Sequence, residues 1–193
     1  MEILAKLLGG VSRVKIMRLF LLNPDQVFEN KEISKRSRVQ PILVRKDISH
    51  LAAIDFIKKT KKGWSFNPNF IYADQIESLL VGADKLNKEV IAGIFKKAGR
   101  VKLLLVAGTF IKNKESRVDL LIVGDNIKRK VVEEGLKKLE AEIGSELTYS
   151  IFDTAEFFYR IEMYDKLVRD ILDFPYEVVL ETKELSTQML KKN

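Results

Sequence analysis

Apolar residues recur at helical spacing through the first third of the chain and predict three helices there. The helices are expected at residues 11–22, at residues 32–37 and from Pro41 onwards. Pro41 suits the first position of a helix, because its φ is already helical and its missing N–H would have no partner there. In this third helix a buried stripe is expected at positions i, i+4 and i+7, which are Val44, Ile48 and Leu51.

Two short strands are expected after these helices. They are placed at residues 56–59 and 64–66 and are joined by the Lys-Lys-Gly sequence of residues 61–63, so that they form a basic hairpin. Residues 26–28 are expected to form a further brief strand that pairs with this hairpin.

The order of these elements is that of a winged helix-turn-helix: a first helix, a turn at residues 38–40, a second helix and the hairpin, or wing. Residues 44–57 resemble the recognition helix and wing of transcription regulators of the ArsR and MarR kind. The resemblance implies that the helix starting at Pro41 enters the major groove of double-stranded DNA, while the wing lies along the backbone or the minor groove. Asp55 stands where those proteins usually have Gly, but Asp tolerates a left-handed backbone better than most residues.

Positive charge is concentrated in this part of the chain. The formal net charge is +7, and residues 1–72 carry 14 Lys and Arg against 6 Asp and Glu, whereas the rest of the chain carries 20 against 21. A surface that binds phosphates needs a field of one sign that releases counterions from the duplex. We therefore predict that DNA is contacted by the polar and basic residues of the motif, which are Lys35, Arg36, Arg38, Gln40, Arg45, Lys46, Ser49, His50, Lys58, Lys59, Lys61 and Lys62.

Individual residues of this set have expected roles. Arg45 and Lys46 are candidate readers of bases or phosphates, because Arg can bond guanine through two hydrogen bonds. An ordinary solvated helix face is the alternative for these two residues, and a charged hairpin tip without a ligand is the alternative for the wing lysines. His50 is expected at the surface or on the DNA backbone, and Trp64 is expected to pack the wing onto its domain.

The middle of the chain, residues 72–98, keeps near-helical apolar spacing and predicts one or two connecting helices, with a break at Gly82. These helices either cover a neighbouring domain or mediate dimerisation. Because regulators of the resembled kind commonly dimerise, a homodimer is expected.

Short apolar runs and amphipathic segments alternate in the remaining part of the chain. Strands are expected at residues 101–107, 118–123, 147–152 and 174–180, and helices at residues 131–143, after a Thr154 cap, around residues 166–172 and, frayed, at residues 184–192. The sequence therefore predicts an α+β chain made of a winged helix-turn-helix domain at residues 1–70, connecting or dimerisation helices at 71–98, a second domain with a small mixed sheet at 99–181 and a tail at 182–193.

The second domain carries Gly108-Thr109, then seven residues, then Arg117-Val118-Asp119. This pattern resembles the signature of the minimal nucleotidyltransferase fold, in which a Gly-Ser pair is followed at this spacing by Asp-x-Asp on a strand. Residues 153–180 also resemble the C-terminal portion of archaeal regulators in which a winged helix precedes such a domain. The resemblance implies an α/β nucleotidyltransferase-like domain.

The acidic pair of the signature is incomplete. Residues i and i+2 of a strand point the same way, so two carboxylates can hold Mg²⁺ ions that bridge nucleotide phosphates. Here Arg117 replaces the first carboxylate, and Asp119 alone would leave two Mg²⁺ ions short of ligands. The domain is therefore interpreted as catalytically inactive, with no catalytic residue, metal or cofactor, and Arg117 and Asp119 could pair with each other.

A vestigial site remains a candidate. Gly108, Thr109, Arg117 and Asp119 could hold a nucleotide or another anionic effector without metal, and a purely structural loop is the alternative. The chain contains no Cys, which excludes disulfides and thiolate metal sites. No apolar run approaches the ~20 residues of a membrane helix, so a cytoplasmic protein without membrane contact is expected.

These expectations combine in a sequence-specific transcriptional regulator that binds double-stranded DNA. Two alternatives stay open. The first is an active nucleotidyltransferase that modifies a protein or a small molecule and uses the winged helix as a partner platform, and turnover that depends on Asp119 would favour it. The second is a protein-interaction module that never meets nucleic acid, which the salt dependence of binding to random duplex would test.

Overall fold

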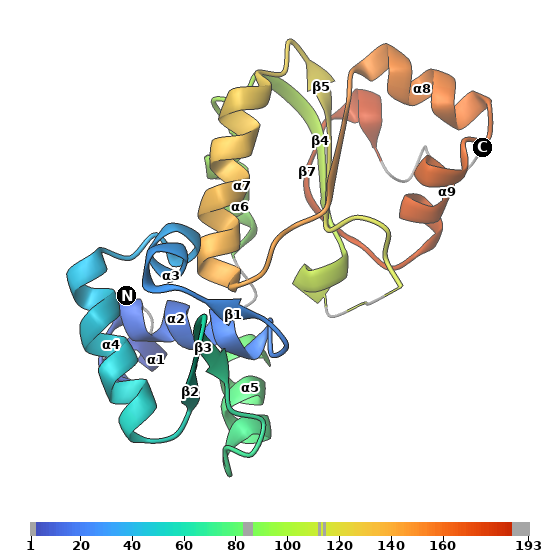
Figure 1. Ribbon diagram of the computed structural model, residues 1–193. Coiled ribbons are helices and arrows are strands. Elements are labelled where there is room, and N and C mark those ends of the chain that lie inside the picture. Colours follow the sequence, from blue (N-terminus) through green and yellow to red (C-terminus); the bar gives the residue numbers. More distant parts are fainter. Residues whose placement is uncertain (1–2, 83–86, 112, 114, 187–193) are drawn as a thin grey trace. The chain divides into compact units, whose positions relative to one another are not determined.

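The computed structural model describes residues 3–82, 87–111, 113 and 115–186. Within these residues the chain forms nine α-helices, a three-stranded antiparallel sheet and a four-stranded mixed sheet, which confirms the α+β class (Figure 1). The chain divides into two compact units. Unit 1 comprises residues 1–84 with 137–146, and unit 2 comprises residues 85–136 with 147–193.

Unit 1 is built mainly from the N-terminal elements of the chain. They are α1 (Ile3–Leu7), α2 (Val11–Leu21), β1 (Val27–Phe28), α3 (Asn30–Ser37), α4 (Pro41–Ala53), β2 (Ile57–Thr60), β3 (Gly63–Phe66) and α5 (Ala73–Gly82). The strands pair antiparallel in the order β1-β3-β2, so the short strand expected before α3 does join the hairpin. The helices and strands expected in this part of the sequence are confirmed to within two or three residues at their ends.

The core of unit 1 is formed by the apolar stripes of these helices together with aromatic residues from the strands. Val44, Ile48 and Leu51 of α4 are buried in it, as the helical spacing predicts. Phe20 meets Phe28 edge-to-face with ring centroids 5.5 Å apart, which fixes β1 on α2. Burial of these side chains holds the two short helices α3 and α4 in place, because helices of this length are marginal alone.

Unit 1 extends beyond the domain boundary expected near residue 70. Leu80 of α5 is buried in the same core, and its carbonyl accepts a hydrogen bond of 2.9 Å from Arg18 Nε. Residues 137–146 also belong to this unit, in which Asn23 Nδ2 donates to the carbonyl of Gly144 at 2.8 Å. The boundary near residue 70 was expected from local sequence patterns, whereas the contacts that extend unit 1 are long-range.

Unit 2 contains the second sheet and most of its helices. Its elements are α6 (Lys88–Phe95), β4 (Arg100–Val106), the 3₁₀ helix η1 (Gly108–Ile111), β5 (Leu120–Asp125), residues 129–136 of α7 (Arg129–Ile143), β6 (Tyr149–Phe152), α8 (Thr154–Glu162), α9 (Lys166–Asp173), β7 (Glu177–Glu181) and the 3₁₀ helix η2 (Lys183–Leu185). The connecting segment thus holds two helices, α5 in unit 1 and α6 in unit 2. The expected break at Gly82 coincides with the end of α5, and residues 83–86 lie outside the described residues.

The four-stranded sheet has the order β6-β5-β4-β7, in which only β5 and β6 run parallel. Leucine and valine side chains of β4 and β5 form a core with α8 and α9, which contribute Phe157, Val168 and Ile171. Figure 1 shows α6 on the other face of this sheet. Because both faces are covered, the central strands are continuous apolar runs, as the sequence suggested.

Two expected features of unit 2 differ in the structure. The cap of α8 is Asp153, whose side chain accepts from the Glu156 N–H at 2.7 Å, and Thr154 is the first helical residue. Thr154 instead donates its hydroxyl hydrogen to Asp125 Oδ1 at 2.6 Å. Of the helix expected at residues 184–192, the described part is only the end of η2, and residues 187–192 lie outside the described residues.

Candidate nucleic-acid interface

A turn of three residues connects α3 to α4. Arg38 ends α3 with a left-handed backbone at φ 53°. Val39 is buried, and its carbonyl accepts a hydrogen bond of 2.6 Å from the Ser34 hydroxyl. Pro41 then takes the first helical position of α4, where it was expected. The turn predicted at residues 38–40 is confirmed.

Helix α4 has a buried face and an exposed face. The buried face includes Asp47, a carboxylate within an otherwise apolar stripe whose side chain is 4% exposed. Arg13 Nε lies 3.1 Å from Asp47 Oδ1, and the Ser12 hydroxyl donates to Oδ2 at 2.6 Å. This carboxylate therefore attaches α4 to the first turn of α2. The exposed face carries the predicted contact residues Gln40, Arg45, Lys46, Ser49 and His50.

The end of α4 is connected tightly to the hairpin. Asp55 has φ 58°, so the left-handed backbone expected at this position is confirmed. Asn67, which follows β3, is buried and donates its side-chain amide to the Asp55 carbonyl at 2.6 Å. The base of the hairpin is thereby fixed to the C-terminus of α4.

The β2–β3 hairpin presents four exposed lysines: Lys58, Lys59, Lys61 and Lys62. Trp64 Nε1 donates to Asn30 Oδ1 of α3 at 3.1 Å, so the expectation that Trp64 anchors the hairpin is confirmed. Gly63 has φ 150°, and a Cβ there would overlap the Phe28 carbonyl of β1. The hairpin is therefore fixed against α3 and β1, and the backbone that carries its lysines has a defined position.

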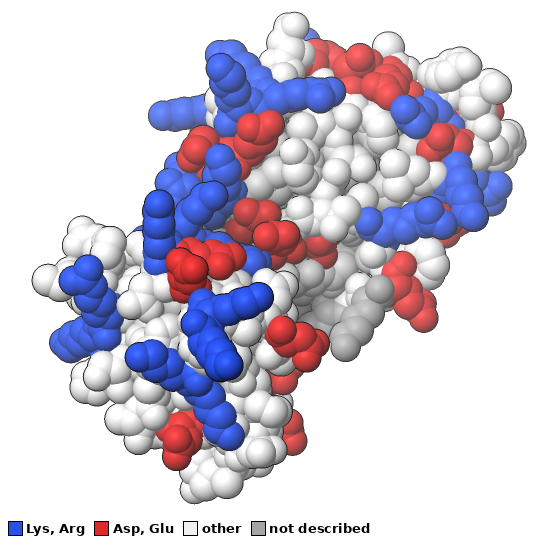
Figure 2. Space-filling view, in the orientation of Figure 1, with Lys and Arg blue, Asp and Glu red and all other residues white. Residues whose placement is uncertain are grey.

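Two groups of exposed cations on unit 1 lie on α4 and on the β2–β3 hairpin. Figure 2 shows Lys and Arg side chains over α4 and over the hairpin. In the part of the chain that the structure describes, Arg45, Lys46 and the four hairpin lysines form no ion pair, unlike Arg13 and Lys15 of α2. Lys35 and Arg38 are also exposed, at the end of α3 and in the turn. The charges of Arg45, Lys46 and the four hairpin lysines are available to an external anion.

Arg36 differs from the other predicted contact residues. Its guanidinium lies 5.2 Å from the centroid of the Phe28 ring, Nη1 donates to Gln26 Oε1 at 3.0 Å, and Nη2 lies 3.4 Å from Glu146 Oε1. Its side chain is 17% exposed. These contacts within unit 1 engage the Arg36 guanidinium, so Arg36 is less accessible to an external anion than Arg45 or the hairpin lysines.

The residues of the nucleotidyltransferase-like pattern are placed in the loops that precede β5. Asp119 accepts two backbone hydrogen bonds, from the Thr109 N–H to Oδ1 at 2.6 Å and from the Thr148 N–H to Oδ2 at 2.8 Å. Gly108 has φ 52° and lies so close to Asp119 Oδ1 that a Cβ would overlap it. Asp119 therefore connects the segment that follows β4 to the residue that precedes β6 through these two hydrogen bonds.

The pairing suggested between Arg117 and Asp119 is wrong. Arg117 Nε instead forms an ion pair with Asp170 of α9, and Arg117 is itself exposed. The strand expected from residue 118 begins at Leu120, so Arg117 and Asp119 both precede it and are not paired on a strand face. The structure brings Gly108, Thr109 and Asp119 together, and it turns Arg117 to a different partner.

A charged cluster that the sequence did not suggest lies at the other end of the sheet. Lys102 of β4 has a side chain that is 8% exposed, and its Nζ lies 2.8 Å from Glu184 Oε1 and 3.0 Å from Asp125 Oδ2. The hydrogen bond with Glu184, and then that with Asp125, raises the pKa of Lys102. The hydrogen bond from the Thr154 hydroxyl, and then that from Lys102, lowers the pKa of Asp125. A lysine inside an apolar run was the available signal.

Replacing Lys102 with methionine is expected to remove a pH-dependent part of the stability of unit 2. The Lys102 contribution is complete below its ordinary pKa of 10.5 and is lost as pH rises through the raised folded value. The Asp125 contribution is complete above its ordinary pKa of 3.8 and is lost as pH falls through the lowered folded value. Urea unfolding at a series of pH values measures the free energy of unfolding of wild type and variant. The difference between them should shrink at high pH and at low pH, and a difference that stays constant over the whole pH range would contradict the prediction.

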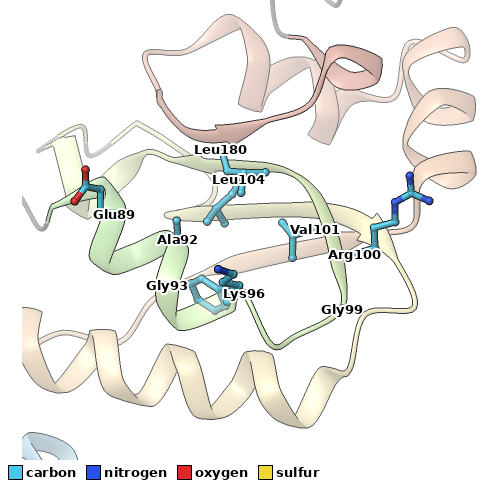
Figure 3. Close-up of a pocket in the computed structure, with 10 residues that line it drawn as sticks. Glu89, Ala92, Gly93, Lys96, Gly99, Arg100, Val101, Leu104 and Leu180 are labelled. Atoms are coloured by element: carbon cyan, nitrogen blue, oxygen red, sulfur yellow. The ribbon is translucent and has the colours of Figure 1, made fainter.

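A cavity of about 490 Å³ lies in unit 2 between α6 and strands β4 and β7 (Figure 3). Its apolar lining includes Leu104 and Leu180, and its charged lining residues Glu89, Lys96 and Arg100 are exposed. Figure 3 shows Glu89 and Arg100 directed away from the cavity at opposite ends. The volume suits a small molecule, but the described lining residues include no buried polar side chain that could orient one. The lining among described residues does not include the Gly108–Asp119 pattern.

Two further observations concern metal binding and membrane-spanning helices. Among the residues that the structure describes, no group of three or more His, Asp or Glu side chains is placed to hold a metal ion. None of the described helices is long and apolar enough to cross a membrane.

Comparison of the chain with protein-family models, with curated proteins and with solved structures finds no match.

Proposed function

We propose that this protein is a sequence-specific transcriptional regulator that binds double-stranded DNA through unit 1, which we interpret as a winged helix-turn-helix. The observation that carries the proposal is the exposed, unpaired set of cations on α4 and on the β2–β3 hairpin. A helix of this kind can place its outer face in the major groove, while the hairpin acts as a wing on the phosphates. Sequence-independent attraction would come from the lysines and base discrimination from α4.

The rigid attachment of α4 and the hairpin supports this interpretation. Base reading requires side chains on an element of fixed position, because a misplaced helix loses its hydrogen bonds with the base edges. The Asp47–Arg13 pair fixes the middle of α4 to the first turn of α2, and the Asn67–Asp55 hydrogen bond fixes the end of α4 to the hairpin. We further propose that two copies bind a pseudo-palindromic site whose half-sites are about one or two helical turns apart.

For unit 2 we propose a domain without nucleotidyltransferase activity. Both oxygens of Asp119 accept backbone hydrogen bonds, and a cation stands at the position of the other carboxylate of the signature and is paired with Asp170. Both observations favour a structural role of the loop over the rival proposal of an active enzyme. They also weaken the proposal of a vestigial nucleotide site, because Arg117 is engaged with α9.

The proposal predicts different effects for a base reader and a phosphate contact. Arg45→Ala should weaken binding to a selected site by about 5- to 150-fold and relax its sequence preference, since a bidentate base contact contributes ~1–3 kcal/mol. Lys61→Ala should lower affinity evenly across sequences and reduce the salt slope by ~0.9. Fluorescence anisotropy with selected and random duplexes measures both, and Lys130→Ala in unit 2 is the control. Equal effects of the first two variants on all sequences would contradict these roles.

A further inference from the structure

The second residue of α4 is an isoleucine that the fold leaves in solvent. Ile42 is 72% exposed, although Val44 and Ile48 of the same helix are completely or almost completely buried. An apolar residue at the surface of a helix contributes little to the core, so packing within unit 1 does not account for Ile42. The residues on the same side of α4 indicate another role for Ile42.

Ile42 lies on the same face of α4 as the proposed DNA contacts. Arg45 and Lys46 follow it at i+3 and i+4, and Ser49 follows at i+7, which places the four residues on one side of a helix. All four are exposed. Pro41 before Ile42 fixes the helix start, so Ile42 stands in the first turn. In helices that enter the major groove, residues of the N-terminal part contact the base edges.

An isoleucine side chain has no hydrogen-bonding group, which limits what it can recognise in the major groove. The apolar group exposed there by an unmodified base pair is the C5 methyl of thymine. We propose that Ile42 is a specificity-determining residue that packs against a thymine methyl, in an A·T pair next to the base pairs contacted by Arg45 and Lys46. This inference rests on the proposed DNA-binding function and adds a base identity to it.

The test removes one thymine methyl group from the DNA at a time. Full-length protein is titrated against its selected duplex and against duplexes in which each thymine is replaced singly by deoxyuridine, which lacks only the methyl. Wild type should lose about three- to fivefold in affinity at one thymine of each half-site, the effect of exposing one methyl. Ile42→Ala should bind the thymine and deoxyuridine forms of that position equally. Ile54→Ala changes another exposed isoleucine, 56% exposed and just after the other end of α4, and should behave as wild type.

Each other result has a defined meaning. A selected site without thymine, no deoxyuridine effect in wild type, or the same effect in Ile42→Ala would overturn the Ile42 assignment and leave the proposed function standing. Conversion of a dimer to a monomer by Ile42→Ala in sedimentation would also overturn it, because Ile42 would then be a contact between copies. If wild type binds no duplex above the level of an inert protein, the proposed function fails together with the inference.

Discussion

Arg13→Ala is expected to lower the free energy of unfolding of unit 1 by about 3 kcal/mol, the lower end for breaking a buried ion pair. The Asp47 side chain is 4% exposed, so its carboxylate cannot be solvated when the guanidinium is removed. The Ser12 hydroxyl remains as a donor, but a neutral donor compensates a buried charge only in part. Arg13 Nη1 also donates to the Leu8 carbonyl at 3.3 Å, and this contact with the segment after α1 is lost as well.

Urea unfolding followed by far-ultraviolet circular dichroism measures this loss. Arg129→Ala removes an exposed arginine at the start of α7 and should stay within ~0.5 kcal/mol of wild type. The double variant Arg13→Met with Asp47→Leu should recover most of the stability, because an apolar pair can replace a buried ion pair. An Arg13→Ala variant as stable as the Arg129→Ala control would show that Asp47 does not need its cation.

Removing the four hairpin lysines together is expected to have the largest effect on DNA affinity. In the variant with alanine at Lys58, Lys59, Lys61 and Lys62, the dependence of log affinity on log salt should flatten by up to ~3.6, at ~0.9 per phosphate contact. At low salt the affinity for random duplex should fall on the order of a hundredfold. The turn itself should persist, since the Thr60 hydroxyl contacts Gly63 and Lys62 through their backbone atoms.

The control for this variant changes the net charge equally. Alanine at Lys96, Lys97, Lys128 and Lys130 removes four exposed lysines of unit 2 and should leave the salt slope close to that of wild type. The two variants are compared by anisotropy over a range of salt concentrations. If both lose the same affinity, the attraction comes from total charge and the hairpin has no special role.

Local sequence patterns were sufficient for most elements of the fold. Helix α4 was predicted because its stripe and its proline are both local signals, and the hairpin because a basic turn separates two β-prone segments. The left-handed Asp55 was anticipated from the resemblance, in which Gly is usual at this position, and from the tolerance of Asp for this backbone. Long-range pairs were not predictable: Asp47 breaks the apolar stripe of α4, but its partner Arg13 is 34 residues earlier.

The candidate site shows the same division between local and long-range information. Exposure of Arg45 and of the hairpin lysines followed from the rarity of buried charges. The contacts of Arg36 were not predictable, because its partners Phe28 and Glu146 come from other elements. The ion pairs of Lys102 were missed, because a lysine in an apolar strand indicates a buried charge but does not identify Glu184 as its partner. Arg117 was assigned to Asp119 by proximity in sequence, whereas its partner belongs to α9.

Selection of binding sites from a random duplex pool tests the central claim most directly. The pool is enriched with full-length protein and, in parallel, with the variant that lacks the four hairpin lysines. We predict that wild type enriches a motif of two related half-sites about one or two helical turns apart. A wild-type pool that stays indistinguishable from the input after repeated rounds would contradict the claim that α4 and the hairpin read DNA.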